Sequence, residues 1–201
     1  MAIQPLDARQ TRSQEGGPSF TLSNRLFRLL WNLTWAVAAS WTPPPLRGWR
    51  RFLLKAFGAQ LGSNADVRGS AKVWYPPHLH LADRALLAER VTCYNMAPIS
   101  LGEGALVSQG AHLCAGSHDI TTVEFQLVAR PIVIGARAWI AAEAFVGPGV
   151  KVGEGAVLGA RGVTFASLEP WGVYAGNPAR WLKRRVLRSG VPAHSAGDVP
   201  P

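Results

Sequence analysis

The stretch "IGARAWIAAEAFVGPGVKVGEGAVLGARGV", Ile134–Val163, repeats every six residues. A large apolar residue begins each of the first five units, at Ile134, Ile140, Val146, Val152 and Leu158. This period matches neither an α-helix, with about 3.6 residues per turn, nor a simple strand, with a period of about 2. It fits short strands joined by tight turns, with one apolar residue per unit pointing inward and glycine permitting the turn. Three such sides make a triangular coil, and stacked coils pair as parallel strands, so the stretch predicts an all-β solenoid.

The same period extends toward the N-terminus, with two slips of two residues that we expect to be small bulges at corners. The apolar residues of these earlier units are Val67, Val73, Leu79, Leu81, Leu87, Cys93, Ile99, Leu101, Val107 and Leu113. The stretch "LCAGSHDITTVEFQLVARP", Leu113–Pro131, then breaks the pattern directly after His118. We expect residues 119–131 to form a loop that leaves the coil at a corner, where loops commonly build functional sites.

Residues 23–58 precede the repeats and are rich in Trp and Arg. Two helices are predicted, at 24–41 and 46–57, separated by Pro43–Pro45. The first is short for a membrane span. Two interpretations remain open: an interfacial membrane anchor made of alternating Trp and Arg, or a pair of helices that cap the end of the solenoid.

The remaining boundaries follow from changes in composition along 201 residues, a length that suits one domain. We expect a flexible N-terminal arm at 1–22 and the solenoid at 59–169. A turn and a short basic helix are predicted at 170–188, and a disordered tail at 189–201. Cys93 and Cys114 form no CxxC pair, and the first twenty residues hold no apolar signal core. A reducing cytoplasm is therefore expected.

The net charge of +9 is concentrated near the two ends of the chain. Such clusters can be a plain solvated surface, but they also suit anionic lipid or a phosphate-bearing ligand. Nucleic acid is not expected as a partner, because no nucleic-acid-binding motif accompanies the charge.

His118 is the strongest candidate for chemistry among the five histidines. It lies where the coil ends and the loop begins, and a histidine in a cleft can take a proton from a hydroxyl near neutral pH. His112 occupies the same place in the preceding unit, and both should point away from the core. Asp119 or a backbone carbonyl could orient the His118 ring.

Several stretches together resemble the hexapeptide-repeat acetyltransferases. They are "GSHD" followed by a loop, the repeat run from Pro131 to Val163, the ending "YAGNPARWLKRR", and the opening "RLFRLLWNLTWAV". The resemblance covers roughly residues 60–187 and is greatest to the O-acetyltransferases of colanic acid biosynthesis, relatives of the galactoside, maltose and Nod-factor enzymes. It implies a left-handed parallel β-helix, a homotrimer, and acetyl-CoA as cosubstrate with no metal.

The resemblance also assigns roles to residues. His118 matches a general base that deprotonates a sugar hydroxyl for direct acetyl transfer at a subunit interface. The positions that match the coenzyme site are Trp139, Ala142, Ala160, Phe165, Ala166, Arg180 and Lys183. The positions that match the acceptor side are Asn95, Cys93 and Asp119. Two positions depart from the pattern: Ala166 stands where relatives often carry lysine, and Cys93 where they carry asparagine.

The expected function is therefore O-acetylation of a saccharide or lipid-linked glycan, in the cytoplasm or at the inner face of an anionic membrane. One alternative is a zinc-dependent lyase of the γ-carbonic anhydrase type, which needs three converging histidines, such as His112, His118 and either His78 or His80. The other is a non-catalytic scaffold for membrane-bound glycan assembly, since fold alone does not imply function.

Overall fold

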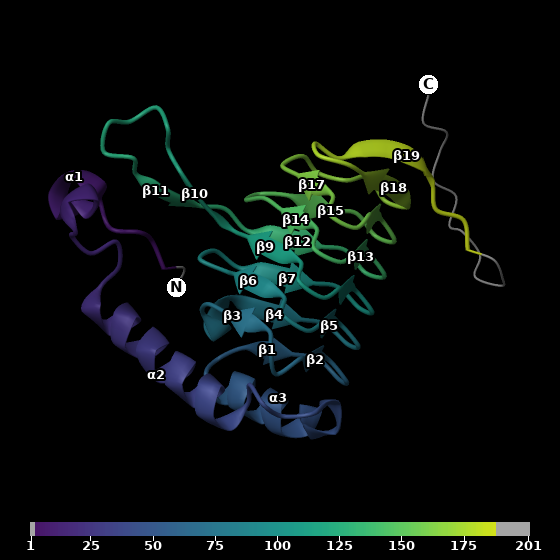
Figure 1. The fold of residues 1–201 in the computed structure, drawn as a ribbon, viewed down its shortest axis with the longest axis horizontal. Helices are drawn as coiled ribbons and strands as arrows, with labels where there is room; N and C mark the ends of the chain where they lie inside the picture. Colours follow the sequence, from purple (N-terminus) through teal and green to yellow (C-terminus); the bar gives the residue numbers. More distant parts are fainter. Residues whose placement is uncertain (1–2, 188–201) are drawn as a thin grey trace.

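The structure is a computed structural model that describes residues 3–187. Its body is a stack of triangular coils whose three sides are three sheets (Figure 1). The first sheet contains β1 (Gln60–Leu61), β4 (Leu79–Leu81), β7 (Ile99–Leu101), β12 (Ile132–Ile134) and β15 (Lys151–Val152). The second contains β2 (Asp66–Val67), β5 (Leu86–Leu87), β8 (Leu106–Val107), β13 (Trp139–Ile140), β16 (Val157–Leu158), β18 (Gly172–Ala175) and β19 (Arg180–Arg184). The third contains β3 (Lys72–Val73), β6 (Thr92–Tyr94), β9 (His112–Cys114), β14 (Phe145–Val146) and β17 (Val163–Thr164).

The repeat residues form the core, as the period of six predicts. Ile134, Ile140, Val146, Val152 and Leu158 are all 2% exposed or less. Burial of one such side chain contributes about 1.5–3 kcal/mol, so the column of inward residues is the main source of stability. Strands of successive coils pair in parallel and in register, for example Trp139 with Leu106 on one side and with Val157 on the other. The predicted class, a left-handed parallel β-helix with N-terminal helices, is confirmed.

Two of the three corners turn through a residue with left-handed backbone, and this residue is often not glycine. Arg84, Arg137, Glu143 and Arg161 have φ between 56° and 59°. Their side chains form ion pairs with neighbouring coils, namely Arg84 with Glu103, Arg137 with Glu154, and Arg161 with Glu143. These surface pairs offset part of the backbone strain of each turn.

The third corner, between the third and first sheets, is irregular. The two slips of the repeat follow this corner and are not bulges at it. They lie within β4 and β7, where Leu79 and Leu81, and Ile99 and Leu101, all point into the core, and the 3₁₀ turn η3 (Pro76–His78) precedes β4. The predicted loop leaves the coil at this corner, as an antiparallel hairpin of β10 (Gly116–His118) and β11 (Leu127–Ala129). The backbone N–H of Ala115 donates to the Tyr94 carbonyl at 3.0 Å, and that of Ile132 donates to the Pro98 carbonyl at 3.0 Å. These bonds keep the coil in register on both sides of the hairpin.

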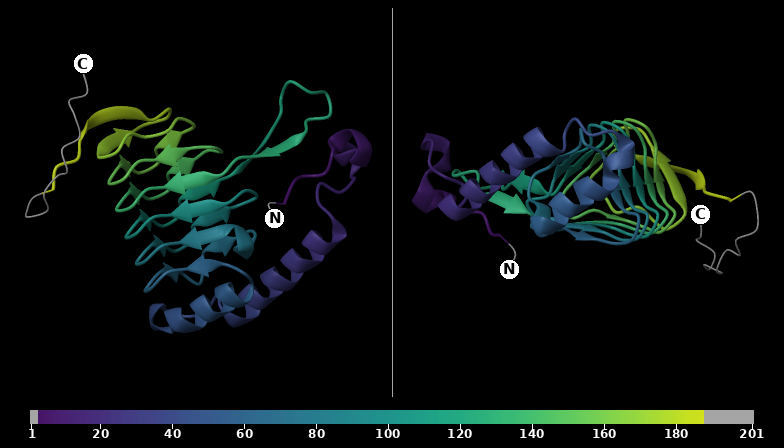
Figure 2. Two further views of the ribbon diagram at one scale, coloured as in Figure 1. Left: turned by 180° about the vertical axis from the view of Figure 1, so that it is seen from behind. Right: turned by 90° about the horizontal axis from the view of Figure 1, so that it is seen from below.

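The N-terminal helices α2 (Leu22–Ala38) and α3 (Arg47–Ala56) lie across the first coil, joined through η2 (Pro44–Leu46) (Figure 2). The indole N–H of Trp31 donates to the Val73 carbonyl at 2.7 Å, and that of Trp35 donates to the Gly69 carbonyl at 3.0 Å. The buried Arg50 donates to the Val67 carbonyl at 2.7 Å. These residues satisfy carbonyls at the open end of the coil stack, so the helices cap the solenoid. Among the described residues no helix combines the length and apolarity needed to cross a bilayer.

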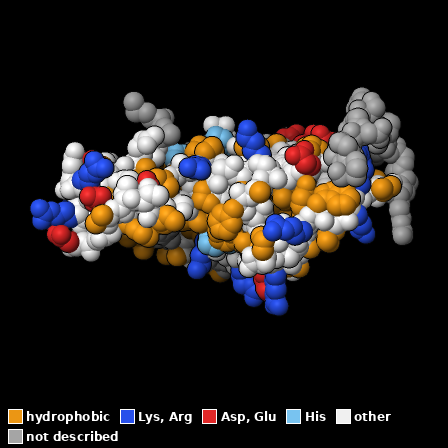
Figure 3. All heavy atoms as spheres, turned by 90° about the horizontal axis from the view of Figure 1, so that it is seen from above, with side chains coloured by type: hydrophobic (Ala, Val, Ile, Leu, Met, Phe, Trp, Pro, Cys, Tyr) orange, Lys and Arg blue, Asp and Glu red, His pale blue; other side chains and the backbone are white. Residues whose placement is uncertain are grey.

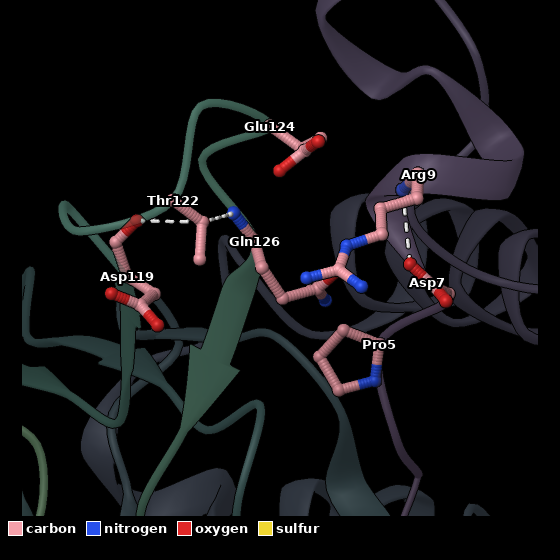
Figure 4. Close-up of a pocket in the computed structure, with 7 residues that line it drawn as sticks. All are labelled: Pro5, Asp7, Arg9, Asp119, Thr122, Glu124 and Gln126. Carbon is pink, nitrogen blue, oxygen red and sulfur yellow. Dashed lines mark hydrogen bonds between the residues drawn. The ribbon is translucent and has the colours of Figure 1, made fainter.

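The segment predicted as a flexible arm, 1–22, contains short helical turns over its described part and contacts the hairpin. It contains α1 (Ala8–Thr11) and η1 (Ser13–Glu15). The Ala8 N–H donates to Gln126 Oε1 at 2.6 Å, and Gln126 Nε2 donates to the Leu6 carbonyl at 3.1 Å. Figure 4 shows Gln126 reaching from the hairpin toward this segment. Polar backbone contacts of this kind leave no periodic signal in the sequence.

The basic helix predicted within 170–188 is wrong. Residues Arg180–Arg184 form β19, which pairs antiparallel with β18 after a turn at Gly176–Pro178. The turn residues Gly and Pro indicate a hairpin, and pairing with the exposed edge of β18 outweighs helix propensity. The cationic side chains of β19 then protect the new sheet edge from further pairing. The tail predicted at 189–201 lies outside the described residues.

Candidate active site

His118 ends β10, and its ring is held by the hairpin itself. Its Nδ1 lies 2.7 Å from the Phe125 carbonyl oxygen. A carbonyl can only accept, so Nδ1 carries the proton and Nε2 of the neutral ring keeps its lone pair. The Phe125 ring lies 5.3 Å from the imidazole, at 33° to its plane. The exposed side chain of His118 therefore presents an oriented proton acceptor to solvent.

The carbonyl that holds His118 comes from a residue in an unusual conformation. Phe125 has φ of 54°, in the left-handed region, at the turn where its N–H donates to the Thr122 carbonyl. The base of the hairpin is equally constrained, because a Cβ at Gly116 would lie 2.5 Å from Met96 Sδ. Glycine at this position lets β10 pass close to the coil below.

Asp119 does not orient the His118 ring. Its carboxylate accepts from the backbone N–H of Thr121 at 2.9 Å and from the Thr121 hydroxyl at 2.6 Å. These hydrogen bonds stabilise the charged form and lower the pKa of Asp119. The carboxylate therefore fixes the tip of the hairpin, while the backbone carbonyl of Phe125 fulfils the orienting role.

His118 borders two cavities, one on each face of the hairpin. The first, of about 420 Å³, contains Asp119, Arg130 and Phe165 among its lining residues. The second, of about 480 Å³, contains Arg25, Arg28, Trp74 and Tyr94. A third cavity of about 420 Å³ separates the hairpin from the N-terminal segment and has no histidine in its lining (Figure 4). His118 is thus placed to act on groups that reach it from either side.

The residues predicted for the coenzyme follow the outside of the last coils toward the first cavity. Trp139 lies on the second sheet, 42% exposed, and donates its indole N–H to Ser108 at 2.8 Å. Ala142 and Ala160 lie in stacked turns between the second and third sheets, where the Arg161 N–H donates to the Ala142 carbonyl. Phe165, 69% exposed, reaches the cavity beside His118. Small side chains at the two turns leave the backbone open to a close ligand.

Three other residues of that set lie farther along the chain. Ala166 is exposed, and its N–H donates to the Thr164 hydroxyl at 3.2 Å. Arg180 and Lys183 are both exposed on β19. This strand lies at the top of the coil stack in Figure 1, the side from which Figure 3 is seen. In the structure Phe165 and Asp119 therefore line one cavity with His118. Arg180 and Lys183 lie on β19, the last strand of the solenoid, and do not line that cavity.

The expectation that Cys93 and Asn95 face an acceptor is not met in the structure. Cys93 points into the core at 1% exposure, and burial raises the pKa of its thiol to about 12. Asn95 is fully buried at the irregular corner, where its amide bonds the backbone N–H and carbonyl of Tyr75 at 3.0 and 2.8 Å. Asn95 thus holds two successive coils together, and neither side chain is free to bind a substrate.

Four residues near His118 were not identified from the sequence: Arg25, Arg28, Trp74 and Tyr94. The Arg28 guanidinium lies 4.3 Å from the Trp74 ring centroid, and Trp74 and Tyr94 pack edge to face at 5.5 Å. Trp74 and Tyr94 occupy equivalent positions in successive coils, which is a detectable signal. Nothing in the sequence indicates that α2 would bring Arg28 to them.

The described residues contain no group of three or more His, Cys, Asp or Glu placed to hold a metal. His78 is instead buried, with Nδ1 3.2 Å from the Asn95 carbonyl, and His80 lies beside Ser100 on the first sheet. His112 packs edge-on against Phe145. A zinc lyase therefore has no ligand set in this part of the chain.

Comparisons with known proteins agree with the fold and the repeat. No family model matches the chain. It is 44% identical over 157 residues to the Escherichia coli (strain K12) protein named as the colanic acid biosynthesis acetyltransferase WcaF, covering 77% of this chain and 86% of that protein. It is 25% identical over 137 residues to the galactoside O-acetyltransferase of the same strain, covering 67% and 68%.

Solved structures show the same architecture at low sequence identity. The galactoside acetyltransferase in complex with coenzyme A superposes with a TM-score of 0.75 at 21% identity, over 89% of this chain and 91% of that one. The hexapeptide-repeat acetyltransferase of Vibrio cholerae O1 biovar eltor in complex with acetyl coenzyme A gives 0.71 at 20% identity, over 81% and 87%. The six-residue repeat, the coil fold and the 44% identity over 77% of the chain together show that the chain belongs to the hexapeptide-repeat acetyltransferase family.

Proposed function

We propose that the protein is an acetyl-CoA-dependent O-acetyltransferase that acts on a hydroxyl of a saccharide or lipid-linked glycan, with His118 as general base. The observation that carries the proposal is the 2.7 Å contact between His118 Nδ1 and the Phe125 carbonyl, which leaves Nε2 free between two cavities. The family relation supports the acetyl donor.

The reaction follows from that geometry. Nε2 takes the proton of the acceptor hydroxyl while the oxygen attacks the thioester carbonyl of acetyl-CoA. The tetrahedral intermediate collapses, the carbon–sulfur bond breaks, and the imidazolium returns the proton to the leaving thiolate. The products are the acetyl ester and coenzyme A, and no acyl-enzyme forms.

The two cavities suit different reactants. Phe165 lies across the third sheet from the turns at Ala142 and Ala160 and lines the first cavity beside His118, so we assign this cavity to the thioester end of the coenzyme. The cavity with Trp74 and Tyr94 offers aromatic surface suited to a sugar ring. Its lining contains two arginines and no carboxylate, which favours an acceptor that carries an anionic group.

The test is acetyl transfer by purified His118→Ala and His118→Asn, measured as release of coenzyme A thiol with a panel of neutral and acidic saccharide acceptors. Loss of the base should lower the rate by about 10²–10⁴-fold. Coenzyme A binding, measured by calorimetry, should persist, because the side chain of residue 118 is not assigned to the coenzyme. Full activity in either variant would remove His118 from the mechanism. A variant that also lost coenzyme A binding would contradict the assignment of the two cavities.

A further inference from the structure

Helix α2 carries a second apolar face that no described residue covers. Its inner face contacts the coils through Trp31 and Trp35, which are buried. Its outer face presents large apolar side chains at helical spacing, each more than half exposed: Leu22, Leu26, Leu29, Leu30, Leu33 and Val37. A helix on the surface of a soluble domain normally has one apolar stripe, facing the core. A second stripe along the whole helix indicates a partner.

Aromatic rings continue this face beyond the end of α2. The Trp41 indole N–H donates to the Val37 carbonyl at 2.8 Å, and the Trp49 indole N–H donates to the Ala38 carbonyl at 2.7 Å. Phe52 stacks on Trp49, with ring centroids 5.6 Å apart, and is 61% exposed. Both indoles thus have their polar atom satisfied within the protein while the ring remains exposed. Such rings suit the boundary between water and lipid.

The charge around the apolar face has one sign. Residues 22–57 include six Lys and Arg and no Asp or Glu. Arg50 is buried in an ion pair with Asp66, whereas Arg25, Arg47 and Lys55 are exposed and take part in none of the ion pairs found among residues 3–187. An apolar face bordered by unpaired cations matches a surface of anionic headgroups. Two copies packed face to face would instead bring like charges together.

We propose that this end of the solenoid binds the surface of an anionic phospholipid membrane. The outer face of α2, with Trp41, Trp49 and Phe52, enters the headgroup region, and the cations contact lipid phosphates. The 17 residues of α2 extend about 25 Å, and the helix lies in the plane of the membrane. Figure 2 shows α2 and α3 together across this end, opposite to β18 and β19. The proposal rests on these helices and does not depend on the chemistry at His118. Of the side chains placed at the membrane, only Arg25 also lines a cavity beside His118, and the variants used in the test leave it unchanged.

Vesicle sedimentation of the full chain tests the proposal. The probe is vesicles of equal parts phosphatidylglycerol and phosphatidylcholine, compared with phosphatidylcholine alone. The double variant Leu29→Ser/Leu33→Ser should weaken partitioning about tenfold or more. A matched control, Leu182→Ser/Val186→Ser, removes apolar side chains of similar exposure from the opposite end and should bind like the wild type. Arg47→Glu/Lys55→Glu should abolish the preference for the anionic vesicles, and added salt should weaken it.

The proposal is overturned by three results. One is no sedimentation with the anionic vesicles, and another is equal loss in the α2 variant and the control variant. The third is a change of oligomeric state in Leu29→Ser/Leu33→Ser, measured by sedimentation equilibrium without lipid, because the stripe would then be a contact between protein chains. All replaced side chains are exposed, so thermal unfolding should match the wild type and exclude misfolding as the cause.

Discussion

The orientation of His118 depends on one carbonyl, and that carbonyl depends on the backbone of Phe125. The left-handed φ of 54° turns the Phe125 carbonyl toward Nδ1. Asp119, which is adjacent in sequence, is engaged with Thr121 instead. A backbone carbonyl in a strained conformation thus does what a carboxylate does in a His–Asp pair. Phe125 is therefore a positioning residue.

A pair of substitutions separates the effect of the backbone conformation at residue 125 from the effect of losing the Phe ring. Phe125→Asn and Phe125→Val both remove the ring, but Asn tolerates the left-handed region and the β-branched Val does not. We expect Phe125→Val to lower kcat at least about tenfold below Phe125→Asn, with little change in the KM of acetyl-CoA. Steady-state kinetics measures both. Equal kcat values in the two variants would show that the conformation does not matter.

The buried His78 should make stability depend on pH. Burial lowers its pKa, with smaller opposing contributions from hydrogen bonds to the backbone of Asn95 and Met96. The unfolded chain therefore binds a proton more readily than the native one. Stability is present above the unfolded pKa near 6.5 and is lost as pH falls through the lower, folded value. Thermal unfolding from pH 7 to pH 5 should show a smaller decline in His78→Gln than in the wild type, whereas parallel curves would contradict this role.

The period of six predicted the coils, because each side of a coil needs one inward apolar residue and the sequence has to supply it at regular spacing. Val146 and Leu158 illustrate this, and both are fully buried. The position of the hairpin was predictable for the same reason, because the six-residue repeat stops after His118 and resumes only at Ile134. Asn95 was misplaced because a family resemblance carries a position but not the direction of a side chain at an irregular corner. Cys93 lies on β6, and its inward direction follows from the repeat of six, which the resemblance did not outweigh. β19 was mistaken for a helix because its partner edge exists only in the folded molecule.

The two interpretations of the Trp-rich segment 23–58, a cap and a membrane anchor, concern different tryptophans of that segment. Trp31 and Trp35 cap the coil, as one interpretation predicted. Trp41 and Trp49 face outward, as the other requires. Periodicity alone could not assign them, because α2 has apolar residues on two opposite faces.

The cap formed by α3 should be sensitive at Arg50. Its guanidinium donates to the Pro43 carbonyl at 2.7 Å and forms an ion pair with Asp66 at 3.1 Å, at 1% exposure of its side chain. Arg50→Ala leaves the carbonyls of Val67, Pro43 and Pro44 without this donor. It also leaves the buried carboxylate of Asp66 with only its second cation, Arg68. We expect a loss of about 3–5 kcal/mol in the free energy of unfolding, measured by urea denaturation. Arg47→Ala is the matched control, since its exposed side chain makes one hydrogen bond, to Asn64. A loss no larger than that of the control would show that the cap does not depend on Arg50.

His118 lies on a hairpin that extends away from the coils of its own chain (Figure 1). The residues predicted for the coenzyme, among them Ala142 and Ala160, lie on the outer turns of the stack. The resemblance noted in the sequence implies a homotrimer, and on that basis we propose a site shared between neighbouring chains.

Mixed assemblies can test that arrangement. His118→Ala lacks the base, and Ala160→Trp should block the proposed coenzyme path by its bulk. If one site uses both positions from different chains, co-expression of the two inactive variants should restore part of the activity in thiol-release assays. Sedimentation equilibrium should give three chains per particle. Mixed trimers that remain inactive would place both residues of a site on a single chain.

The irregular corner has a consequence for how such enzymes diverge. The backbone bonds of Ala115 and Ile132 lock the flanking strands to the coil below, so the polypeptide between them can be exchanged without changing the stack. A hairpin of another length or chemistry that keeps His118 and the carbonyl holding its ring would change the lining of both cavities beside the imidazole, to which Asp119, Arg130 and Leu127 contribute, while the coils stay the same. Selectivity can therefore evolve through this one segment without any change in the repeats that build the coils.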